Sequence, residues 1–316
     1  MAIWAAAAIV GIVEAPPIVV AAGILAFIVV VLGGFAVGRA LRRMTQPLDA
    51  LVEASGRIEA GDYTVRVPVA GGGEMHSLTR AFNQMSTQLQ ASDERRRAFL
   101  ADVTHELRTP LTVIQGQLEA IEDGVYEPDP ERIAALLANA RHMAALIDDL
   151  HTISLAEVGA LELHMVPTDL DALVDEVVSG YAPAAELAGV RLSSEPAPSA
   201  VTVALDPAAT QRVLANLVSN ALRHTPPDGR VTLTAGHDGG GIGTIDVVDT
   251  GAGMDPALAA RAFERFEKGP GSDGSGLGLA IARDLVEAQR GSIELASTAG
   301  LGTHVRVSFP LLSDRE

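Results

Sequence analysis

The sequence predicts a multi-domain protein with four successive parts: a transmembrane helix, a pair of amphipathic helices, a helical hairpin and an α/β sandwich. Three observations predict this order. With 316 residues, the chain is too long for one ordinary domain. Residues 1–38 contain a single charged side chain, Glu14. Near residue 168 the spacing of apolar residues changes from a helical period to a mixture of strand and helix patterns. We therefore divide the chain into 1–40, 41–93, 94–160 and 164–313.

The composition excludes several classes of function. The chain has no cysteine, which rules out a disulfide scaffold, a thiolate zinc site, an iron–sulfur cluster and a cysteine nucleophile. Its formal net charge is −17. Direct binding to DNA or RNA is therefore not expected, because such proteins need a cationic surface to displace counterions. A mean hydropathy of +0.25 indicates a membrane segment attached to soluble parts.

The membrane segment is expected at 18–38, where every residue is apolar or glycine. As a helix it covers about 30 Å, the thickness of the hydrocarbon core. Arg39, Arg42 and Arg43 follow at once, so the positive-inside rule places the rest of the chain in the cytoplasm. We expect the protein in the inner or plasma membrane, in contact with lipid. The alternative, a buried helix of a soluble protein, is disfavoured because such helices rarely lack a polar face.

A shorter apolar stretch, 2–13, precedes this segment and is broken by Pro16 and Pro17. At about 18 Å it is short for a span, and it lacks the basic start of a signal peptide. It is interpreted either as a short first span or as the remainder of a longer first half.

The sequence of 41–93 predicts two short amphipathic helices, joined by an extended linker at 61–68 and a run of glycines at 71–73. Such helices cannot bury their apolar stripes alone, so a dimeric four-helix coiled coil is expected, with a generic coiled-coil stalk as the alternative. The stripes are Leu41, Met44, Leu48, Leu51, Val52 and Ile58 in the first helix and Met75, Leu78, Phe82, Met85 and Leu89 in the second.

A continuing helix over 99–111 carries the first candidate catalytic group, His105. His105 lies about 200° round the helix from the apolar stripe and is expected to face solvent. Glu106 can accept a proton from one ring nitrogen and leave the other free to attack. Thr109 shares the face of His105, and its presence excludes the zinc-protease pattern H-E-x-x-H. Pro110 is expected to bend the helix, because it cannot donate to the carbonyl of Glu106.

A second helix is predicted over 131–155, after a break at Gly124 and 127–130. It completes a helical hairpin whose apolar stripe again needs a partner, so this part is expected to form an all-α four-helix bundle in a dimer.

The last part predicts an α/β sandwich. The expected strands are 190–194, 201–205, 230–235, 244–249, 292–296 and 304–309, and the expected helices are 170–188, 207–224, 256–263 and 277–289.

Four clusters in this part predict a nucleotide site. Asn216 and Asn220 share one helix face, and their amide oxygens suit Mg²⁺. Asp249 ends a strand and can accept a hydrogen bond from an exocyclic amine, while the glycines after it let the backbone approach a flat ligand. Basic residues occur in 263–268, and the glycine-rich stretch 269–278 opens a helix, where free N–H groups bind phosphate. A Rossmann site is excluded because no strand precedes these glycines, and there is no Walker A lysine motif.

Taken together and in this order, these residues resemble the membrane sensor histidine kinases of two-component systems, of the envelope-stress type. The resemblance covers 39–311. It implies a HAMP relay forming a parallel four-helix coiled coil, a HisKA-type dimerisation domain, and an ATP-binding domain with the Bergerat, or GHKL, fold.

The resemblance also implies roles for individual residues. His105 matches the phosphate-accepting histidine, Glu106 its acid/base neighbour, and Thr109 the position that orients water for dephosphorylating the partner. The N-box is matched by Asn216 and Asn220, with Asn220 preferred as the Mg²⁺ ligand. The lid between Lys268 and Gly274 is shorter and less basic than is usual. The remaining ATP-binding positions implied are Arg223, His224, Asp249, Gly251, Gly253, Phe263, Phe266, Lys268, Gly274, Gly276, Leu277, Gly278 and Thr303.

The implied activity is autophosphorylation of His105 by Mg²⁺ and ATP, followed by transfer to an aspartate of a response regulator and by its dephosphorylation. The implied assembly is a homodimer, with a hinge near 155–163. Two other functions are weighed against this one: a non-catalytic membrane scaffold that binds nucleotide as a switch, and an ATPase of the chaperone or topoisomerase kind.

Overall fold

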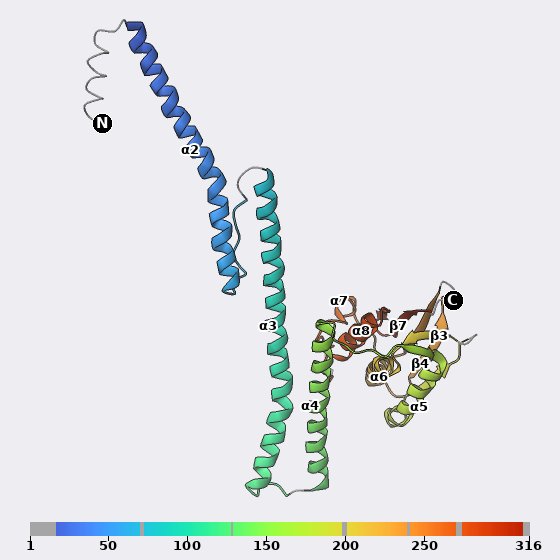
Figure 1. The fold of residues 1–316 in the computed structure, drawn as a ribbon. Helices are drawn as coiled ribbons and strands as arrows, with labels where there is room; N and C mark the ends of the chain where they lie inside the picture. Colours follow the sequence, from blue (N-terminus) through green and yellow to red (C-terminus); the bar gives the residue numbers. More distant parts are fainter. Residues whose placement is uncertain are drawn as a thin grey trace. The chain divides into compact units, whose positions relative to one another are not determined.

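This computed structural model describes residues 17–69, 73–127, 129–197, 201–238, 241–269 and 274–311, and it falls into two compact units that divide between Ala98 and Phe99 (Figure 1). The stretch 2–13 and most of the predicted lid, 270–273, lie outside the described residues. Within them, the order of parts predicted from the sequence is confirmed: long helices come first, a helical hairpin follows, and an α/β sandwich ends the chain.

The first unit begins with the long helix α2 (Pro17–Glu59). Its segment Ala21–Arg39 is long and apolar enough to cross a membrane, with a mean hydropathy of 2.5 and no buried side chain. The membrane helix and the helix expected after it are one continuous helix, because 39–46 consists mainly of helix-forming residues without glycine. The boundary predicted at residue 40 therefore lies inside α2.

The connector after α2 is held against helix α3 (Gly73–Glu122) by side chains of that helix. The Asn83 side chain bonds both backbone groups of Val67, accepting from its N–H at 2.9 Å and donating to its carbonyl at 2.8 Å. Arg66 donates to the side chains of Ser86 and Gln90. A small core of Leu51, Ala54, Val65 and Val67 lies beneath these bonds.

The second unit begins with the end of α3 and with helix α4 (Pro130–Glu157). Helix α3 continues through Pro110 as an uninterrupted helix. The turn before α4 is fixed by the Asp129 carboxylate, which caps the helix by accepting from the N–H of Arg132 at 2.7 Å. Both helices leave large apolar side chains exposed, as a hairpin that awaits a partner should: Leu111, Leu118, Ile133, Leu137 and Ile147.

The terminal sandwich has a five-stranded sheet in the order β2-β4-β5-β7-β6, in which β2 and β4 are parallel and the other pairs antiparallel. Its strands are β2 (Arg191–Glu195), β4 (Arg230–His237), β5 (Ile242–Asp249), β6 (Ser292–Thr298) and β7 (Gly302–Pro310).

A two-stranded sheet pairs β1 (Val166–Asp169) with β3 (Thr202–Leu205). Strand β1 is absent from the sequence prediction, because four residues with a proline at the second position carry little strand signal. Helix α7 (Pro256–Arg261) is also two residues shorter than predicted.

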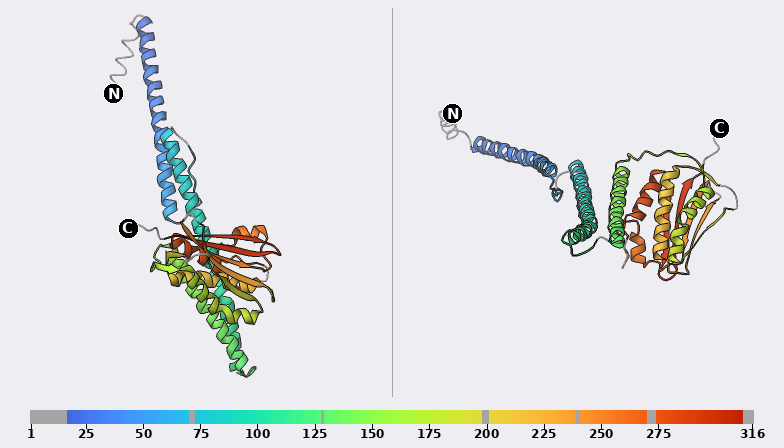
Figure 2. Two further views of the ribbon diagram at one scale, coloured as in Figure 1. Left: turned by 90° about the vertical axis from the view of Figure 1, so that its right-hand side faces the viewer. Right: turned by 90° about the horizontal axis from the view of Figure 1, so that it is seen from below.

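Helices α5 (Leu170–Ala188), α6 (Pro207–His224) and α8 (Gly278–Ala288) pack on one face of the five-stranded sheet (Figure 2). Alternate residues of the central strands β4, β5 and β7 are buried, which gives the sheet one apolar face and one polar face. Leu214, Ile281 and Phe309 are among the fully buried side chains between the layers. The core therefore lies between the helices and the sheet, and α6 and α8 reach the edge at which the candidate site opens.

Candidate nucleotide-binding site

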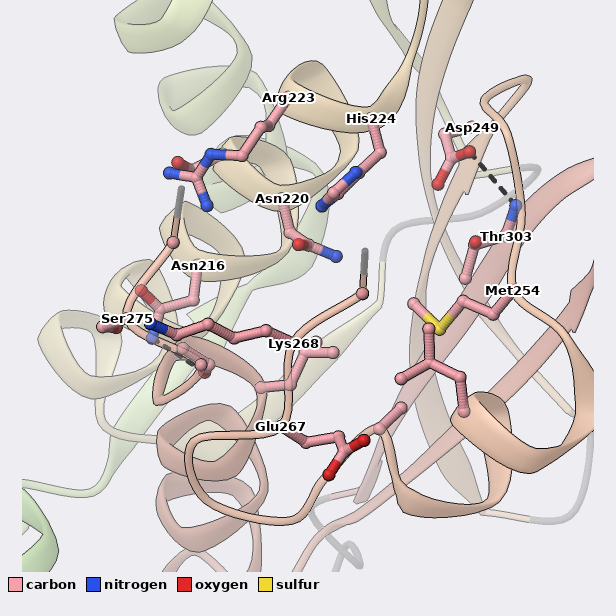
Figure 3. Close-up of a pocket in the computed structure, with 18 of the residues that line it drawn as sticks. Asn216, Asn220, Arg223, His224, Asp249, Met254, Glu267, Lys268, Ser275 and Thr303 are labelled. Atoms are coloured by element: carbon pink, nitrogen blue, oxygen red, sulfur yellow. Dashed lines mark hydrogen bonds between the residues drawn. The ribbon is translucent and has the colours of Figure 1, made fainter. Parts of the chain in front are cut away.

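A cavity of about 600 Å³ opens between α6, the start of α8 and the carboxyl end of β5 (Figure 3). It brings together residues that lie up to 161 positions apart, from His142 to Thr303. The sequence-predicted residues that line it are Asn216, Asn220, Arg223, His224, Asp249, Gly253, Lys268, Gly274, Gly276, Gly278 and Thr303.

Asp249 is fixed at one end of the cavity, where β5 ends. Its Oδ1 accepts from the backbone N–H of Gly251 at 2.8 Å and from that of Thr303 at 3.1 Å (Figure 3). Burial raises the pKa of the Asp249 carboxyl, and these two hydrogen bonds oppose that rise. Within the described residues the hydrogen bonds of this carboxylate use Oδ1 alone, so Oδ2 can accept from a ligand.

Two glycines allow the backbone to pass close to this end of the cavity. Gly253 has a φ of +64°, and a Cβ there would lie 2.0 Å from the carbonyl oxygen of Thr298. Gly251 does not line the cavity. A Cβ on Gly251 would meet the carbonyl oxygen of His224 at 2.5 Å, so this glycine is needed for packing of the turn against the end of α6.

Asn216 and Asn220 project from successive turns of α6 into the cavity (Figure 3). The Asn216 amide nitrogen donates to the carbonyl of Gly278 at 3.1 Å, which ties α6 to the start of α8. The side chain of Asn220 makes no hydrogen bond with the part of the chain that the structure describes, so its amide can serve a ligand. Arg223 and His224 follow at the exposed end of α6. Burial, and then the charge of Arg223, lower the pKa of His224, and the nearby Asp249 carboxylate opposes this shift.

The start of α8 forms the opposite wall. Its first residue is Gly278, and no side chain caps this helix end, so its N–H groups are available to an anion. Gly276 has a φ of +72°, and a Cβ there would lie 2.7 Å from the backbone of Phe266. Leu277 does not line the cavity. Its side chain is fully buried in the core and anchors the glycine-rich turn.

The segment before these glycines contacts the phosphate-acceptor helix predicted from the sequence. Phe266 lies outside the cavity and packs against Phe99 of α3, with ring centroids 5.8 Å apart. Lys268 lines the cavity and its Nζ lies 2.8 Å from Oε1 of Glu106, also on α3. Two residues predicted separately, Glu106 for proton transfer and Lys268 for nucleotide binding, are therefore in direct contact.

The other predicted residues of the hairpin lie apart from the cavity. His105 is exposed on α3, as its position opposite the apolar stripe predicts. The Thr109 hydroxyl donates to the carbonyl oxygen of His105 at 3.2 Å, one turn earlier. Neither residue lines the cavity.

Sequence reasoning missed the residues that α4 contributes to the cavity. These are His142, Ala145, Leu146 and Asp149, and the apolar residues Met254 and Leu258 also line the cavity. The helical period marks which α4 residues share a face, but it carries no information on which other element that face contacts.

Three family models match successive parts of the chain. The HAMP domain matches 39–91, the His Kinase A (phospho-acceptor) domain matches 95–159, and the family of histidine kinase-, DNA gyrase B- and HSP90-like ATPases matches 205–313.

Curated relatives match over most of this chain. The signal transduction histidine-protein kinase BaeS of Escherichia coli is 35% identical over 278 residues, which cover 86% of this chain and 59% of BaeS. The sensor histidine kinase MtrB of Mycolicibacterium paratuberculosis is 30% identical, over 91% of this chain and 53% of MtrB. The chain therefore spans between half and three fifths of the length of these relatives.

Solved structures of histidine kinases also align with this chain. The Acinetobacter baumannii histidine kinase AdeS aligns with a TM-score of 0.58 and 25% identity over 66% of this chain and 98% of that one. Full-length ShkA in complex with AMPPNP aligns with a TM-score of 0.52 and 30% identity, over 67% of this chain and 45% of that one.

Proposed function

The chain belongs to the sensor histidine kinases of two-component systems, and from this premise we propose that it phosphorylates itself on His105 with ATP and passes the phosphoryl group to an aspartate of a response regulator. The observation that carries the proposal is the cavity itself. It gathers the asparagine, aspartate and glycine clusters around one space, while α3 of the same chain presents an exposed histidine beside a carboxylate.

The polarity of the cavity supports one direction of ATP binding. At one end Oδ2 of Asp249 is positioned to accept from the exocyclic amine of adenine, next to Thr303 and the apolar Met254. At the other end Arg223, Lys268 and the N-terminus of α8 supply positive charge and N–H groups for the phosphates. ShkA, which has a similar fold, is described as a complex with AMPPNP.

The donor set fits Mg²⁺. This cation prefers neutral or carboxylate oxygens and keeps several ligands from water and phosphate. Asn220 offers an amide oxygen without a competing hydrogen bond among the described residues, and Asn216 keeps its oxygen available because its nitrogen bonds Gly278. When bound, the cation supplies charge neutralisation between the phosphates. Within the described residues no cluster of three acidic, histidine or cysteine side chains offers a competing metal site.

The chemistry asked of the protein is mainly positioning. A ring nitrogen of His105 attacks the γ-phosphorus, an N–P bond forms, and the bond to the departing ADP oxygen breaks. Glu106 takes the proton that the imidazole loses. Because His105 lies outside the cavity, the nucleotide domain must move to meet a histidine. The segment 158–165 between α4 and β1 is the candidate hinge, and its far end is held where the N–H of His164 donates to Asp206 at 2.7 Å.

The same proposal covers the assembly and the dephosphorylation of the regulator by water. The apolar side chains left exposed on α3 and α4 suit a homodimer in which two hairpins form a four-helix bundle. Thr109, one turn after His105, is suited to orient water for dephosphorylating the regulator. The apolar segment Ala21–Arg39 and the arginines after it support a location in the inner membrane, with the catalytic part in the cytoplasm.

The test is labelling of the purified protein with γ-³²P-ATP. We expect acid-labile, alkali-stable phosphate on the native chain and none on His105→Gln. The matched control is His151→Gln, because His151 is also an exposed histidine of the hairpin. If the native chain binds ATP and stays unlabelled, the scaffold function replaces the kinase. If phosphate is released steadily and equally by both variants, the protein is an ATPase of the chaperone or topoisomerase kind.

A second variant tests the metal ligand. Asn220→Asp should abolish labelling while leaving the thermal unfolding temperature within a few degrees of the native value, because the Asn220 side chain makes no hydrogen bond to the described protein. Retained labelling would remove Asn220 from the metal site.

A further inference from the structure

Helix α4 forms one wall of the nucleotide cavity, although its residues lie more than 60 positions before the first residues of the N-box. His142, Leu146 and Asp149 recur at intervals of three and four, so they share the face of α4 that lines the cavity. Leu146 and Ile153, 2% and 1% exposed, join the core of the α/β sandwich. Helix α4 is thus docked against the nucleotide domain and not only connected to it.

One arginine of α6 fastens this docking. Arg212 donates to the hydroxyl of Thr152 at 2.7 Å and to Oδ1 of Asp149 at 2.9 Å, and it lies 3.2 Å from Oδ2 of Asp148. Arg212 precedes Asn216, one of the two predicted Mg²⁺ ligands, by four residues on the same helix. The two side chains therefore lie on the same face of α6, one turn apart.

The two carboxylates held by Arg212 differ in what else they face. Asp149 lines the cavity and its side chain is 22% exposed, while Asp148 is 71% exposed and does not line the cavity. Burial raises the pKa of the Asp149 carboxyl, and Arg212 opposes that rise. Asp149 gives the cavity an acidic side chain on the α4 wall, and its partner Arg212 lies one turn of α6 before Asn216.

We propose that Asp149 is a nucleotide-sensing residue: α4 places its carboxylate in the wall of the nucleotide cavity, so that bound phosphates and docked α4 repel each other. This inference rests on the proposed function, because it needs a nucleotide in this cavity. Binding of the nucleotide weakens the hold of Arg212 on α4 and favours release of the nucleotide domain toward a histidine. By linkage, docking of α4 weakens nucleotide affinity by the same factor.

Nucleotide affinity gives the first test. The dissociation constant of a non-hydrolysable ATP analogue with Mg²⁺ is measured by calorimetry for the native chain, Asp149→Asn and Asp148→Asn. We expect Asp149→Asn to bind at least ~5-fold more tightly, in the range usual for coupled sites. Asp148→Asn should stay within about twofold of native, because it removes the same charge beside the same arginine but outside the cavity. If both variants gain nucleotide affinity equally, the effect comes from net charge alone and the proposal is overturned.

The release of α4 gives the second test. The chain has no cysteine, so an introduced thiol is the only one that can react. Thr152 is buried at the docked face, so a thiol in Thr152→Cys reacts with a thiol reagent only when α4 separates. We expect the Mg²⁺–analogue complex to speed this reaction severalfold, and to lose that effect when Asp149→Asn is added. Ser154→Cys, on the exposed side of α4, is the control and should react at one rate throughout.

The outcomes separate this inference from the function it rests on. A native chain that binds no nucleotide overturns both. The sensing role alone is overturned if the native chain binds nucleotide and labels His105, while Asp149→Asn binds no more tightly than native. The same holds if the thiol of Thr152→Cys reacts at one rate with and without nucleotide.

Discussion

Changing Asp249 to asparagine should convert the adenine end of the cavity from an acceptor into a donor. The asparagine Oδ1 can keep both hydrogen bonds that now reach Asp249, from the N–H groups of Gly251 and Thr303. Its amide nitrogen then takes the place of Oδ2 and faces the exocyclic amine of adenine. The fold should survive, because the two backbone partners remain satisfied and the cost of burying a charge disappears.

The size of the effect follows from the bond that is lost. A hydrogen bond to a charged acceptor contributes about 1.5–3 kcal/mol, which corresponds to about a 10- to 150-fold rise in the dissociation constant for ATP. ITP carries a carbonyl where ATP carries the amine. The native site should reject ITP, and Asp249→Asn should accept it better than the native site does.

The assay is a calorimetric comparison of ATP and ITP binding to the two proteins, in the presence of Mg²⁺. The control is Asp246→Asn on the same strand, because Asp246 pairs with His304 and Arg306 on the opposite face of the sheet. That variant should bind ATP with native affinity.

Two results would refute the reasoning. If Asp249→Asn binds ATP as tightly as the native protein, Asp249 does not contact the base. If ATP and ITP lose affinity by the same factor while Asp246→Asn is unaffected, the substitution has damaged the cavity without altering its selectivity.

Three further predictions follow from individual contacts. Thr109→Ala should keep native autophosphorylation but slow dephosphorylation of the regulator, measured as loss of label from its phosphorylated form; equal rates would exclude the role of Thr109. Gly253→Ala should lower the unfolding temperature by several degrees and weaken nucleotide binding, because its Cβ would clash with the carbonyl of Thr298 and its φ is positive; an unchanged melting curve would contradict this. Asn83→Ala removes two hydrogen bonds to Val67 and should cost about 1–3 kcal/mol in the first unit, seen as faster amide exchange at Val67; native exchange there would show that the connector holds without Asn83.

The local sequence predicted most of the secondary structure, because the spacing of apolar residues within one segment shows whether it forms a helix or a strand and which face it buries. Helices α5 and α6 begin and end at the predicted residues, and each begins after an aspartate that caps it. The departures have physical causes. Strand β1 exists through its pairing with β3 and not through its own propensity. Helix α2 continues past the predicted domain boundary at residue 40, because 39–46 contains no residue that stops a helix.

Candidate site residues were predicted from short motifs whose chemistry is local. A carboxylate followed by glycines at a strand end, amides at positions four apart and glycines before a helix each carry their role within a few residues. Spacing also placed His105 opposite its apolar stripe, and the structure exposes it. Gly251 and Leu277, by contrast, were assigned to the ligand and are used for packing, because a motif does not distinguish the residue that shapes a turn from the one that faces the cavity.

By itself the sequence determined the order of the parts, the apolar segment before the arginines, and the chemical character of each motif, since all of these depend on neighbours along the chain. Only the tertiary structure decided that α4 walls the cavity, that Arg212 holds Asp149, and that Lys268 meets Glu106 across 162 positions. The physical reason is that an amphipathic pattern predicts only that a face will be buried. Which face of which distant element covers it is settled by shape and charge when the elements pack.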